Sequence, residues 1–404
     1  MVDAPLLHGL PGAAVEVLLA PGALVQSLPD LFSACVEALR TRDGVPIDRA
    51  SCSVPTLHPE TRSVQLVWTH LGVAAFPRTY AAVSSPLFTR SPMRPLYEGH
   101  ITVIRERIEP GPAGRAYEIL DELADDGFTD YLATITQAEN PWERAPLTWA
   151  TRHPGGFTQD QVAGLLGLVP FLTLLLAVNA QRTSARSLLA TYLGADAASR
   201  VLDGHIRRGD VVDIEAAVCF CDLRNFTRLS QELNQTELLE LLDDAFEAVV
   251  TAVEAEQGEV LKFIGDAVLA VFRVDPTQGP GDAVVRAYRA GQDTLHRARR
   301  TSDLRVAAGK STLELGLSVH LGRVAYGNIG GPRRLDFTVI GAAVNLASRL
   351  EGMCRTLSHP MVMSDAAACH LRDAPLVYTG RHGLKGIPEP VGIWGAPLSV
   401  VPGV

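Results

Sequence analysis

The sequence predicts a mixed α/β protein of two domains joined by a helical segment. The chain has 404 residues, a length that favours two domains over one. Both halves contain short apolar runs typical of strands beside longer stretches with apolar residues at helical spacing. The stretch between them is polar with helical spacing, which is typical of a linker. The expected division is a first domain over 1–180, a helical linker over 181–212 and a second domain over 213–404.

The overall composition excludes several classes of protein. The chain carries 36 basic and 45 acidic residues, whereas a nucleic-acid-binding protein usually has a basic excess, so we expect no nucleic-acid partner. Hydrophobic residues make up 47% of the chain, too many for a disordered protein. The six cysteines form no CxxC pair, and the eleven histidines show no HxH or HExxH spacing. We therefore expect neither a disulfide framework nor a histidine metal site.

The expected location is the cytoplasm. The N-terminal residues have no positive region ahead of a long apolar stretch, which argues against a secretory signal. Cysteines without a pairing pattern fit reduced thiols in a cytosolic protein. One detail of composition is unusual, because only three of the 36 basic residues are lysine: Lys262, Lys310 and Lys385. The position of each lysine is therefore informative.

The first domain is expected to mix helices and strands. A helix is predicted over Leu24–Leu39, and Pro29 either kinks it or marks its true start. The elements expected after it are a strand over Ser63–Trp68, a helix over Tyr117–Asp125 closed by Gly127, a half-buried strand over Asp130–Thr136 and a strand over Leu147–Thr151.

A long apolar helix is expected to close the first domain. Thr158 and Gln161 have the spacing of a capping box at its start. The 17 residues of Val162–Val178 carry no charge, which is close to the lower limit for a membrane span. A proline, two glycines and a threonine interrupt this stretch. We favour a buried core or dimer helix, with a membrane span as the alternative.

Two aspartates of the second domain follow predicted strands. An apolar strand over Ile214–Cys221 ends in Asp222, and a strand over Glu259–Ile264 runs into Gly265-Asp266 before a hairpin strand over Ala267–Phe272. The helix between them carries an apolar stripe at spacings of three and four: Leu239, Leu242, Phe246, Val249 and Val253. A βαβ-type turn of chain can bring the two aspartates side by side, although they are 44 positions apart.

Paired carboxylates have a clear chemical use. They can share Mg²⁺ or Mn²⁺ ions, which prefer oxygen ligands and keep positions open for phosphate oxygens. The segment after Asp222 also begins a helix, with Phe226 and Thr227 at its start, whose free N–H groups suit a triphosphate. The alternative is that each aspartate is only a turn residue or a helix N-cap, since aspartate is common in both places.

Four motifs of the second half occur together in one order. They are FCDLRNFTRLS, EVLKFIGDAVLAVF, GRVAYGNIGGPRRLDFTVIGAAVNLASRLEG and GLKGIPEPV. With these motifs, the stretch from Asp213 to Ala396 resembles the catalytic domain of class III nucleotidyl cyclases. The resemblance implies a ferredoxin-like α/β fold that forms a homodimer, with active sites at the dimer interface.

The resemblance implies roles for four residues, of which two bind metal ions and two recognise the adenine base. Asp222 and Asp266 match the two metal-binding aspartates, which hold two Mg²⁺ or Mn²⁺ ions in each active site. Lys262 matches the lysine that reads the adenine edge, and Thr338 matches the second base-selecting position, which is threonine in one subgroup of adenylate cyclases. Lysine at this place favours ATP as the substrate, since a guanylate cyclase would be expected to carry an acidic residue there.

Three more matches concern the ribose and the phosphates. Asn345 and Arg349 match the residues that orient the ribose and stabilise the reacting phosphate, and their spacing of four puts them on one face of a helix. Lys385 resembles the lysine that contacts the terminal phosphates. The implied reaction is the conversion of ATP to 3′,5′-cyclic AMP and pyrophosphate by in-line attack of the ribose 3′-hydroxyl.

Two positions depart from the family pattern. Asn225 stands where the family usually has glycine in the phosphate-binding turn, and asparagine tolerates a positive φ better than most residues. Ala342 replaces a common acidic residue that has no catalytic role. The alternatives to an adenylate cyclase are a catalytically degenerate nucleotide-binding signalling protein, for which Asn225 argues, a guanylate cyclase, and a membrane-tethered form.

The first domain resembles a GAF-type sensory domain in the order of its elements. The resemblance implies that an unknown small-molecule or protein signal acts there and changes the packing of the helix that leads to the catalytic domain. Aromatic and histidine side chains that either line a ligand cavity or belong to the core are Trp68, His70, Tyr80, Trp142 and Trp149.

Overall fold

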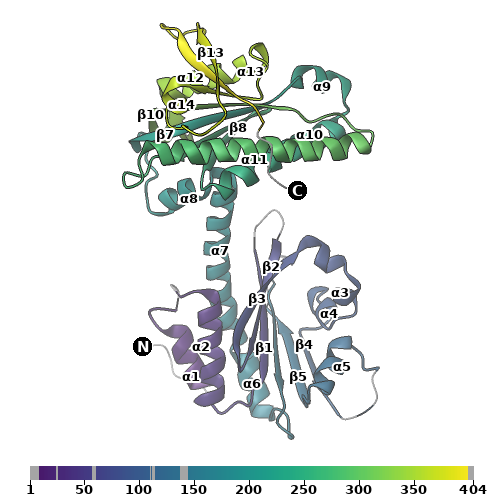
Figure 1. Ribbon diagram of the computed structural model, residues 1–404. Helices are drawn as coiled ribbons and strands as arrows, with labels where there is room; N and C mark the ends of the chain where they lie inside the picture. The colour runs from purple at the N-terminus through teal and green to yellow at the C-terminus, as the bar shows by residue number, and fades with distance from the viewer. Residues whose placement is uncertain are drawn as a thin grey trace. The chain divides into compact units, whose positions relative to one another are not determined.

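The computed structural model divides the chain into two compact units, Met1–Leu188 and Leu189–Val404 (Figure 1). It describes residues 9–23, 26–56, 61–109, 111, 114–136 and 144–398. Trp142 lies outside the described residues. Each unit has its own sheet and its own hydrophobic cores, as expected for two domains of mixed α/β structure.

The first unit is built on a six-stranded antiparallel sheet with the order β3-β2-β1-β6-β5-β4. Its strands are β1 Arg49–Pro55, β2 Thr61–Thr69, β3 Gly72–Thr79, β4 Val103–Arg107, β5 Asp130–Ile135 and β6 Pro146–Thr151. Strand β5 was expected to be half-buried, but all six of its residues are buried, because helices cover both faces of the central strands.

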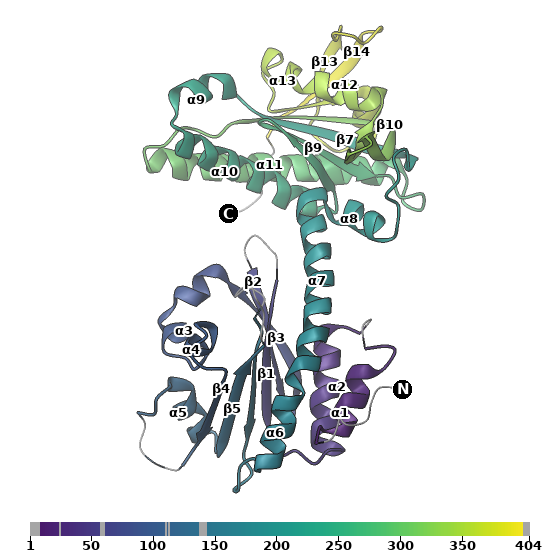
Figure 2. The ribbon, with the colours of Figure 1, turned by 180° about the vertical axis from the view of Figure 1, so that it is seen from behind.

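Helices cover the two faces of this sheet separately (Figures 1 and 2). One face packs against α1 Gly12–Leu19, α2 Leu28–Thr41, α6 Gln159–Gly167 and the first part of α7 Val169–Leu193. The other face lies under the short elements η2 Tyr80–Ser84, α3 Pro86–Thr89, α4 Met93–Tyr97 and α5 Glu118–Asp125. Trp68 and Trp149 lie in the core beside α1 and α2, which is the alternative to lining a cavity.

Two helices of this unit begin at residues that the sequence marks as helix starts. Helix α2 begins at Leu28 with Ser27 as its N-cap and Pro29 in its first turn, so the proline marks the start rather than a kink. The predicted capping box is confirmed, because the Thr158 hydroxyl accepts from the Gln161 N–H and the Gln161 side chain accepts from the Thr158 N–H. The apolar stretch expected as one helix is two, which meet at Leu168.

Helices α6 and α7 together form the only described run that is long and apolar enough to cross a membrane, Gln159–Leu193. About a third of its most apolar window, 35%, is buried inside the structure. Length and composition of this kind also occur in core helices of soluble proteins, so this finding is weak support for a span.

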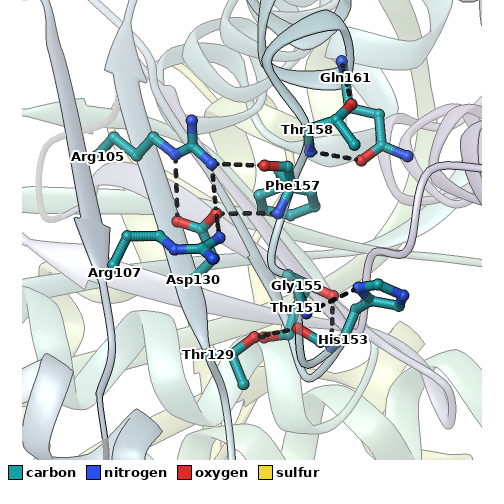
Figure 3. A network of polar contacts seen from close by, with 10 residues as sticks. All are labelled: Arg105, Arg107, Thr129, Asp130, Thr151, His153, Gly155, Phe157, Thr158 and Gln161. Carbon is teal, nitrogen blue, oxygen red and sulfur yellow. Dashed lines mark hydrogen bonds and ion pairs between the residues drawn. The ribbon is translucent and has the colours of Figure 1, made fainter.

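A buried carboxylate fixes the loop that leads into α6 (Figure 3). Asp130 on β5 has no solvent exposure and accepts from Arg105 at 2.8 Å, from Arg107 at 3.0 Å and from the Phe157 N–H at 2.9 Å. Arg105 also donates to the Phe157 carbonyl at 2.6 Å. The loop at Phe157 is therefore bound to strands β4 and β5 immediately before the Thr158 cap of α6.

The second unit is built on an eight-stranded sheet with the order β13-β14-β12-β10-β7-β9-β8, and β11 pairs with β10. Its strands are β7 Val211–Leu223, β8 Glu259–Ile264, β9 Ala267–Arg273, β10 Leu315–Gly331, β11 Arg334–Ile340, β12 Met361–Ser364, β13 Val377–His382 and β14 Val391–Ala396. All pairs are antiparallel except β10 with β12.

The helices of this unit lie on opposite faces of its sheet (Figures 1 and 2). On one face, α10 Gln235–Ala255 and α11 Pro280–Ala307 bury alternate residues of β7 and β9. On the other face, α8 Ala195–Leu202 and α12 Ala342–Glu351 pack with the remaining residues of the same strands. The remaining helices are short: α9 Phe226–Glu232, α13 Met353–Thr356 and α14 Asp365–Ala368.

We expect Asp130→Asn to destabilise the first unit by about 3–5 kcal/mol, because the substitution leaves two arginines without their buried counter-charge. Urea unfolding of the full chain followed by tryptophan fluorescence reports mainly this unit, since three of the four tryptophans belong to it and Trp68 and Trp149 are in its core. The control is Glu16→Gln, which breaks an exposed ion pair with Arg42 and should have little effect. Equal stability of the two variants would contradict the role assigned to Asp130.

Candidate active site

Strand pairing brings Asp222 and Asp266 together at one end of β7. Asp222 is the penultimate residue of β7, and Asp266 lies in the turn between β8 and β9. Cys221 pairs with Val268 of β9, so the turn that precedes β9 lies beside the end of β7. Gly265 gives this turn a φ of +67°, a left-handed conformation that glycine adopts without strain. The predicted proximity of the two aspartates is confirmed.

The two carboxyl groups share a hydrogen bond, and the pKa of Asp222 is raised from 3.8 to about 7. Burial is the largest cause, followed by the hydrogen bond and the negative charge of Asp266 and by the charge of Glu351. Ionisation of Asp222 beside Asp266 is therefore unfavourable without a compensating cation. The pair of carboxyl groups is an oxygen donor set that fits Mg²⁺ or Mn²⁺.

Among the described residues, no group of three or more His, Cys, Asp or Glu side chains is arranged to hold a metal. The aspartate pair therefore offers only two protein ligands. Mg²⁺ in phosphate-processing sites is typically held by one or two carboxylates, with phosphate and water oxygens completing the shell. The donor set thus fits a cation that arrives with, or is completed by, a phosphate-bearing substrate.

A third carboxylate, Glu351 at the end of α12, lies near the pair and was missed in the sequence. A Cβ built on Gly316, the cross-strand partner of Asp222, would lie 2.6 Å from Glu351 Oε1. Burial and the charge of Asp266 raise the pKa of Glu351, and the positive charges of Arg224 and Arg355 oppose this. Glu351 is part of the motif NLASRLEG, but nothing in the sequence places it beside residues 85 or more positions away.

The turn after Asp222 has the geometry expected from Asn225. Asn225 has φ +62° and ψ +20°, in the left-handed region that asparagine tolerates. Its side-chain oxygen accepts from Arg355 at 3.3 Å, which ties the turn to α13. Helix α9 begins directly after it with Phe226, which packs against the core, and Thr227, which is exposed.

Lys262 and Thr338 lie on two strands that contact each other without pairing, and the acidic residue Asp336 lies beside Lys262. Lys262 on β8 forms an ion pair with Asp336 on β11. Thr338 is two residues beyond Asp336 on β11, so the two side chains point to the same face. The structure thus groups Lys262, Asp336 and Thr338, and Asp336 is a residue of this group that the motif comparison did not single out.

Asn345, Arg349 and Lys385 are exposed. The first two lie on α12, and Lys385 lies in the loop between β13 and β14. Arg349 has no ion-pair partner among the residues that the structure describes. Glu351 follows Arg349 by two positions, about 200° around the helix. The helix therefore directs Glu351 toward the aspartates of its own chain and Arg349 away from them.

Known proteins share this second unit. Residues 213–386 match the family model of the adenylate and guanylate cyclase catalytic domain. They form a nucleotidyl cyclase catalytic domain. An adenylate cyclase of Anabaena cylindrica is 29% identical over 155 residues, which are 38% of this chain and 30% of the relative. Adenylate cyclase 1 of Rhizobium meliloti is 28% identical over 159 residues, 39% of this chain and 24% of the relative.

The solved structures similar to the catalytic domain include cyclases of both kinds. The adenylyl cyclase CyaB of P. aeruginosa is 29% identical with a TM-score of 0.43, covering 46% of this chain and 94% of that one. The guanylyl cyclase Cya2 is 26% identical with a TM-score of 0.40, covering 46% and 92%. The chain spans about a third or less of the length of the curated relatives named above.

Two of the three lysines fall at cyclase motif positions, and the third has a structural partner. Lys310 forms an exposed ion pair with Glu240 of α10 at 2.7 Å. Helix α11 ends at Ala307, shortly before this lysine. The buried Arg305 donates to Asp244 at 2.5 Å and to the Ser311 carbonyl at 3.0 Å, which anchors this end of α11.

We expect metal-free protein carrying Asp222→Asn to be more stable than the unsubstituted protein at pH 8. The pKa of Asp222 is about 7 in the folded protein and 3.8 ordinarily, so the folded state favours the protonated form. The unsubstituted protein therefore loses stability as the pH rises from about 4 to about 7, whereas the asparagine variant does not. After allowance for solvent screening, the gain is about 1–2 kcal/mol at pH 8 and near zero at pH 4. Urea unfolding in the presence of a chelator measures it.

The matched control is Asp243→Asn, which removes an exposed aspartate from α10. This variant should show no pH-dependent gain. A gain for Asp222→Asn that is the same at pH 4 and pH 8 would show that the repulsion between the two carboxylates is not its cause.

Proposed function

We propose that the chain is an adenylate cyclase that converts ATP to 3′,5′-cyclic AMP and pyrophosphate. The observation that carries the proposal is the aspartate pair at the end of β7, in a catalytic domain that also groups Lys262 with Thr338. ATP is an intracellular nucleotide, so we place the activity in the cytoplasm.

In the proposed reaction, some site residues hold the metal ions, and others bind the ribose and the phosphates. Asp222 and Asp266 hold Mg²⁺ or Mn²⁺, which when bound lowers the pKa of the ribose 3′-hydroxyl and neutralises the leaving pyrophosphate. Arg349 supplies a fixed positive charge where negative charge develops on the reacting phosphate, and Asn345 orients the ribose. Lys385 contacts the terminal phosphates.

A second copy of the chain completes each site in this proposal. Arg349 is exposed and points away from the aspartates of its own chain, so it serves best the aspartates of a neighbour. In a two-fold dimer the same arrangement occurs twice, which gives two equivalent sites. The homodimer is therefore part of the mechanism and not only a form of assembly.

The choice of ATP rests on Lys262 and Thr338. An ammonium donates hydrogen bonds to the acceptor nitrogens of adenine, and the threonine hydroxyl can accept from its amino group. Asp336 holds Lys262 on the β11 side, where Thr338 also points. A guanylate cyclase remains the second candidate, since a guanylyl cyclase is among the similar structures. The left-handed turn formed at Asn225 weakens the argument for a degenerate site.

We also propose that the first unit is a GAF-like sensory domain that regulates the cyclase. Its six-stranded antiparallel sheet with helices on both faces suits that assignment. The chain passes from α7 into α8, and α8 is bound to the catalytic sheet by a polar cluster inside the second unit. Asp196 of this helix accepts from Tyr326 of β10 at 2.7 Å and forms ion pairs with Arg200 and Arg273.

This cluster, which we call the α8 clamp, also holds β8. The Tyr326 hydroxyl lies 2.9 Å from Glu259 Oε2, and the Arg273 guanidinium stacks 4.0 Å from the Tyr326 ring centre. Burial raises the pKa of Asp196, but the bond from Tyr326 and the charge of Arg273 outweigh it, so the net shift is downward. Glu259 is three residues before Lys262 on β8, so a movement of α8 reaches the base-selecting strand.

The first test is purified full-length protein with ATP or GTP and Mg²⁺ or Mn²⁺, measuring both cyclic nucleotides. We expect cyclic AMP as the main product and its loss by at least about a hundredfold in Asp222→Ala, because the metal site is removed. Preferred cyclisation of GTP would favour the guanylate cyclase, and nucleotide binding without product would favour a degenerate protein.

The second test mixes two inactive variants, Asp222→Ala and Arg349→Ala. If the aspartates and the arginine come from different chains, each mixed dimer keeps one intact site, so an equal mixture recovers up to about a quarter of the full activity. A mixture of Asp222→Ala with Asp266→Ala is the control, because both substitutions damage the same half of the site. Recovery in the control, or none in the first mixture, would contradict the composite site.

The third test is Asp196→Asn, which removes the negative charge of the α8 clamp. We expect cyclase activity to change several-fold while the urea midpoint changes little, since an ion pair that is two-fifths exposed contributes only about 1 kcal/mol. The control is Glu240→Gln, which breaks the exposed ion pair with Lys310 in the same unit. Equal activity of the two variants would show that the clamp does not transmit to the site.

A further inference from the structure

We propose that a cavity in the first unit binds a small organic anion that carries a phosphate or carboxylate group and hydroxyl groups. The cavity lies between the sheet and the short elements η2, α3 and α4, and has a volume of about 260 Å³. The binding stands on the first unit alone. Its regulatory consequence rests on the proposed cyclase activity.

The floor of the cavity is a set of hydroxyl groups on central strands. Ser51 of β1 and Thr148 of β6 are cross-strand partners whose hydroxyl oxygens lie 2.7 Å apart. Ser53 of β1 donates to Ser63 of β2 at 3.1 Å. All four side chains line the cavity, and Ser53 is also hydrogen-bonded to Tyr97. A hydroxyl can take part in more than one hydrogen bond, so this floor offers polar groups to a ligand.

The composition of this floor is not a requirement of packing. On the opposite face of the same strands, Cys52, Leu147 and Trp149 form an apolar core. On the same face, one strand further along, Ala133 of β5 is the cross-strand partner of Thr148 and belongs to the apolar cluster under α5. On this face the sheet therefore changes from hydroxyl-bearing at Thr148, beside the cavity, to apolar at Ala133. Hydroxyls concentrated at a cavity are typical of a site that positions a polar ligand.

The charged side chains among the described lining residues are arginines. Two arginines line the cavity, Arg62 and Arg78, and no acidic side chain does among the described lining residues. The Arg78 guanidinium donates to Gln65 at 2.5 Å and 3.0 Å, which fixes its position over β2 and β3. The Arg62 guanidinium lies 5.6 Å from the centre of the Tyr97 ring. Arginine held in this way presents donors in a fixed geometry that matches phosphate or carboxylate oxygens.

The side of the cavity formed by α3 and α4 is aromatic and uncharged. Tyr97 of α4 and Phe88 of α3 line the cavity with their rings 5.8 Å apart. Burial raises the pKa of Tyr97 to about 12, and its hydroxyl is hydrogen-bonded to Ser53 of the floor, so this wall adds no negative charge. The volume is below the roughly 300–1,000 Å³ of drug-sized pockets. A compact metabolite is therefore a better match than a nucleotide.

The test is calorimetric titration of full-length protein, without metal, with glycerol 3-phosphate and with citrate as probes and with uncharged glycerol as control. We expect one of the two anions to bind at one per chain and glycerol not to bind. Arg78→Gln should weaken that binding at least about tenfold, because it removes a charge-assisted hydrogen bond. Thr148→Val should also weaken the binding of that anion, because it removes one hydroxyl group from the floor of the cavity. Absence of binding by both anions would overturn the proposal.

Arg42→Gln is the matched control, since Arg42 is exposed and follows α2 on the other side of the sheet. Its affinity should equal that of the unsubstituted protein, and urea unfolding checks that all variants are folded. Equal binding by Arg78→Gln and Arg42→Gln would place the probe outside the cavity and refute the proposal. A second arm adds to the cyclase assay whichever of the two anions binds, at constant free Mg²⁺, and we expect a change in rate that Arg78→Gln abolishes. Binding without this change refutes the regulatory step alone, and absence of all cyclase activity refutes the proposed function while the binding arm stays readable.

Discussion

The contact between Asp222 and Asp266 is the constraint on which the second unit depends. Pairing of β7 with β9 brings two negative groups together at a partly buried strand end, and without a cation one of them keeps its proton up to a pH of about 7. A fold that only needed stability would not retain this arrangement, since either aspartate replaced by a neutral residue relieves the repulsion. The pair gains a purpose when a cation compensates both charges and phosphate oxygens complete its ligands. The two carboxylates therefore lower the stability of the metal-free domain, and the same pair is what allows it to hold a cation.

Helix α12 supports the proposal that a second chain completes each site. Its apolar residues pack on the sheet, its last residue Glu351 approaches the aspartates, and Arg349 projects into solvent. A helix cannot turn residues 349 and 351 to the same side, because two positions correspond to about 200°. In the proposed mechanism the positive charge of Arg349 therefore comes from another copy, while the same helix keeps a third carboxylate near the aspartate pair of its own chain. Helical geometry thus agrees with the two-chain site that the resemblance to cyclases implies.

The sequence was sufficient where local chemistry decides the structure and insufficient where distant residues meet. Capping spacing, the strand-end position of Asp222 and the left-handed turn at Asn225 are properties of a few neighbouring residues, and the structure has them as expected. The division of the apolar stretch into α6 and α7 was missed, although Pro170 suits the first turn of a helix. Asp336, Glu351 and the α8 clamp could not be found, because they depend on contacts between segments separated by tens of residues.

The cavity of the first unit could not be predicted from the sequence for the same reason, because it depends on how distant strands pair. Ser51, Ser53 and Thr148 are ordinary strand residues in the sequence, and aromatic side chains were the more obvious candidates for a ligand site. The register of β1 with β2 and β6 is what aligns these hydroxyls on one face, while Trp68 and Trp149 are directed into the opposite core. Side-chain alternation thus places the apolar residues of each strand in the core and the hydroxyl-bearing ones at the cavity. If the proposed ligand binds there, a substitution in the floor of the cavity is expected to change its affinity more than the stability of the fold.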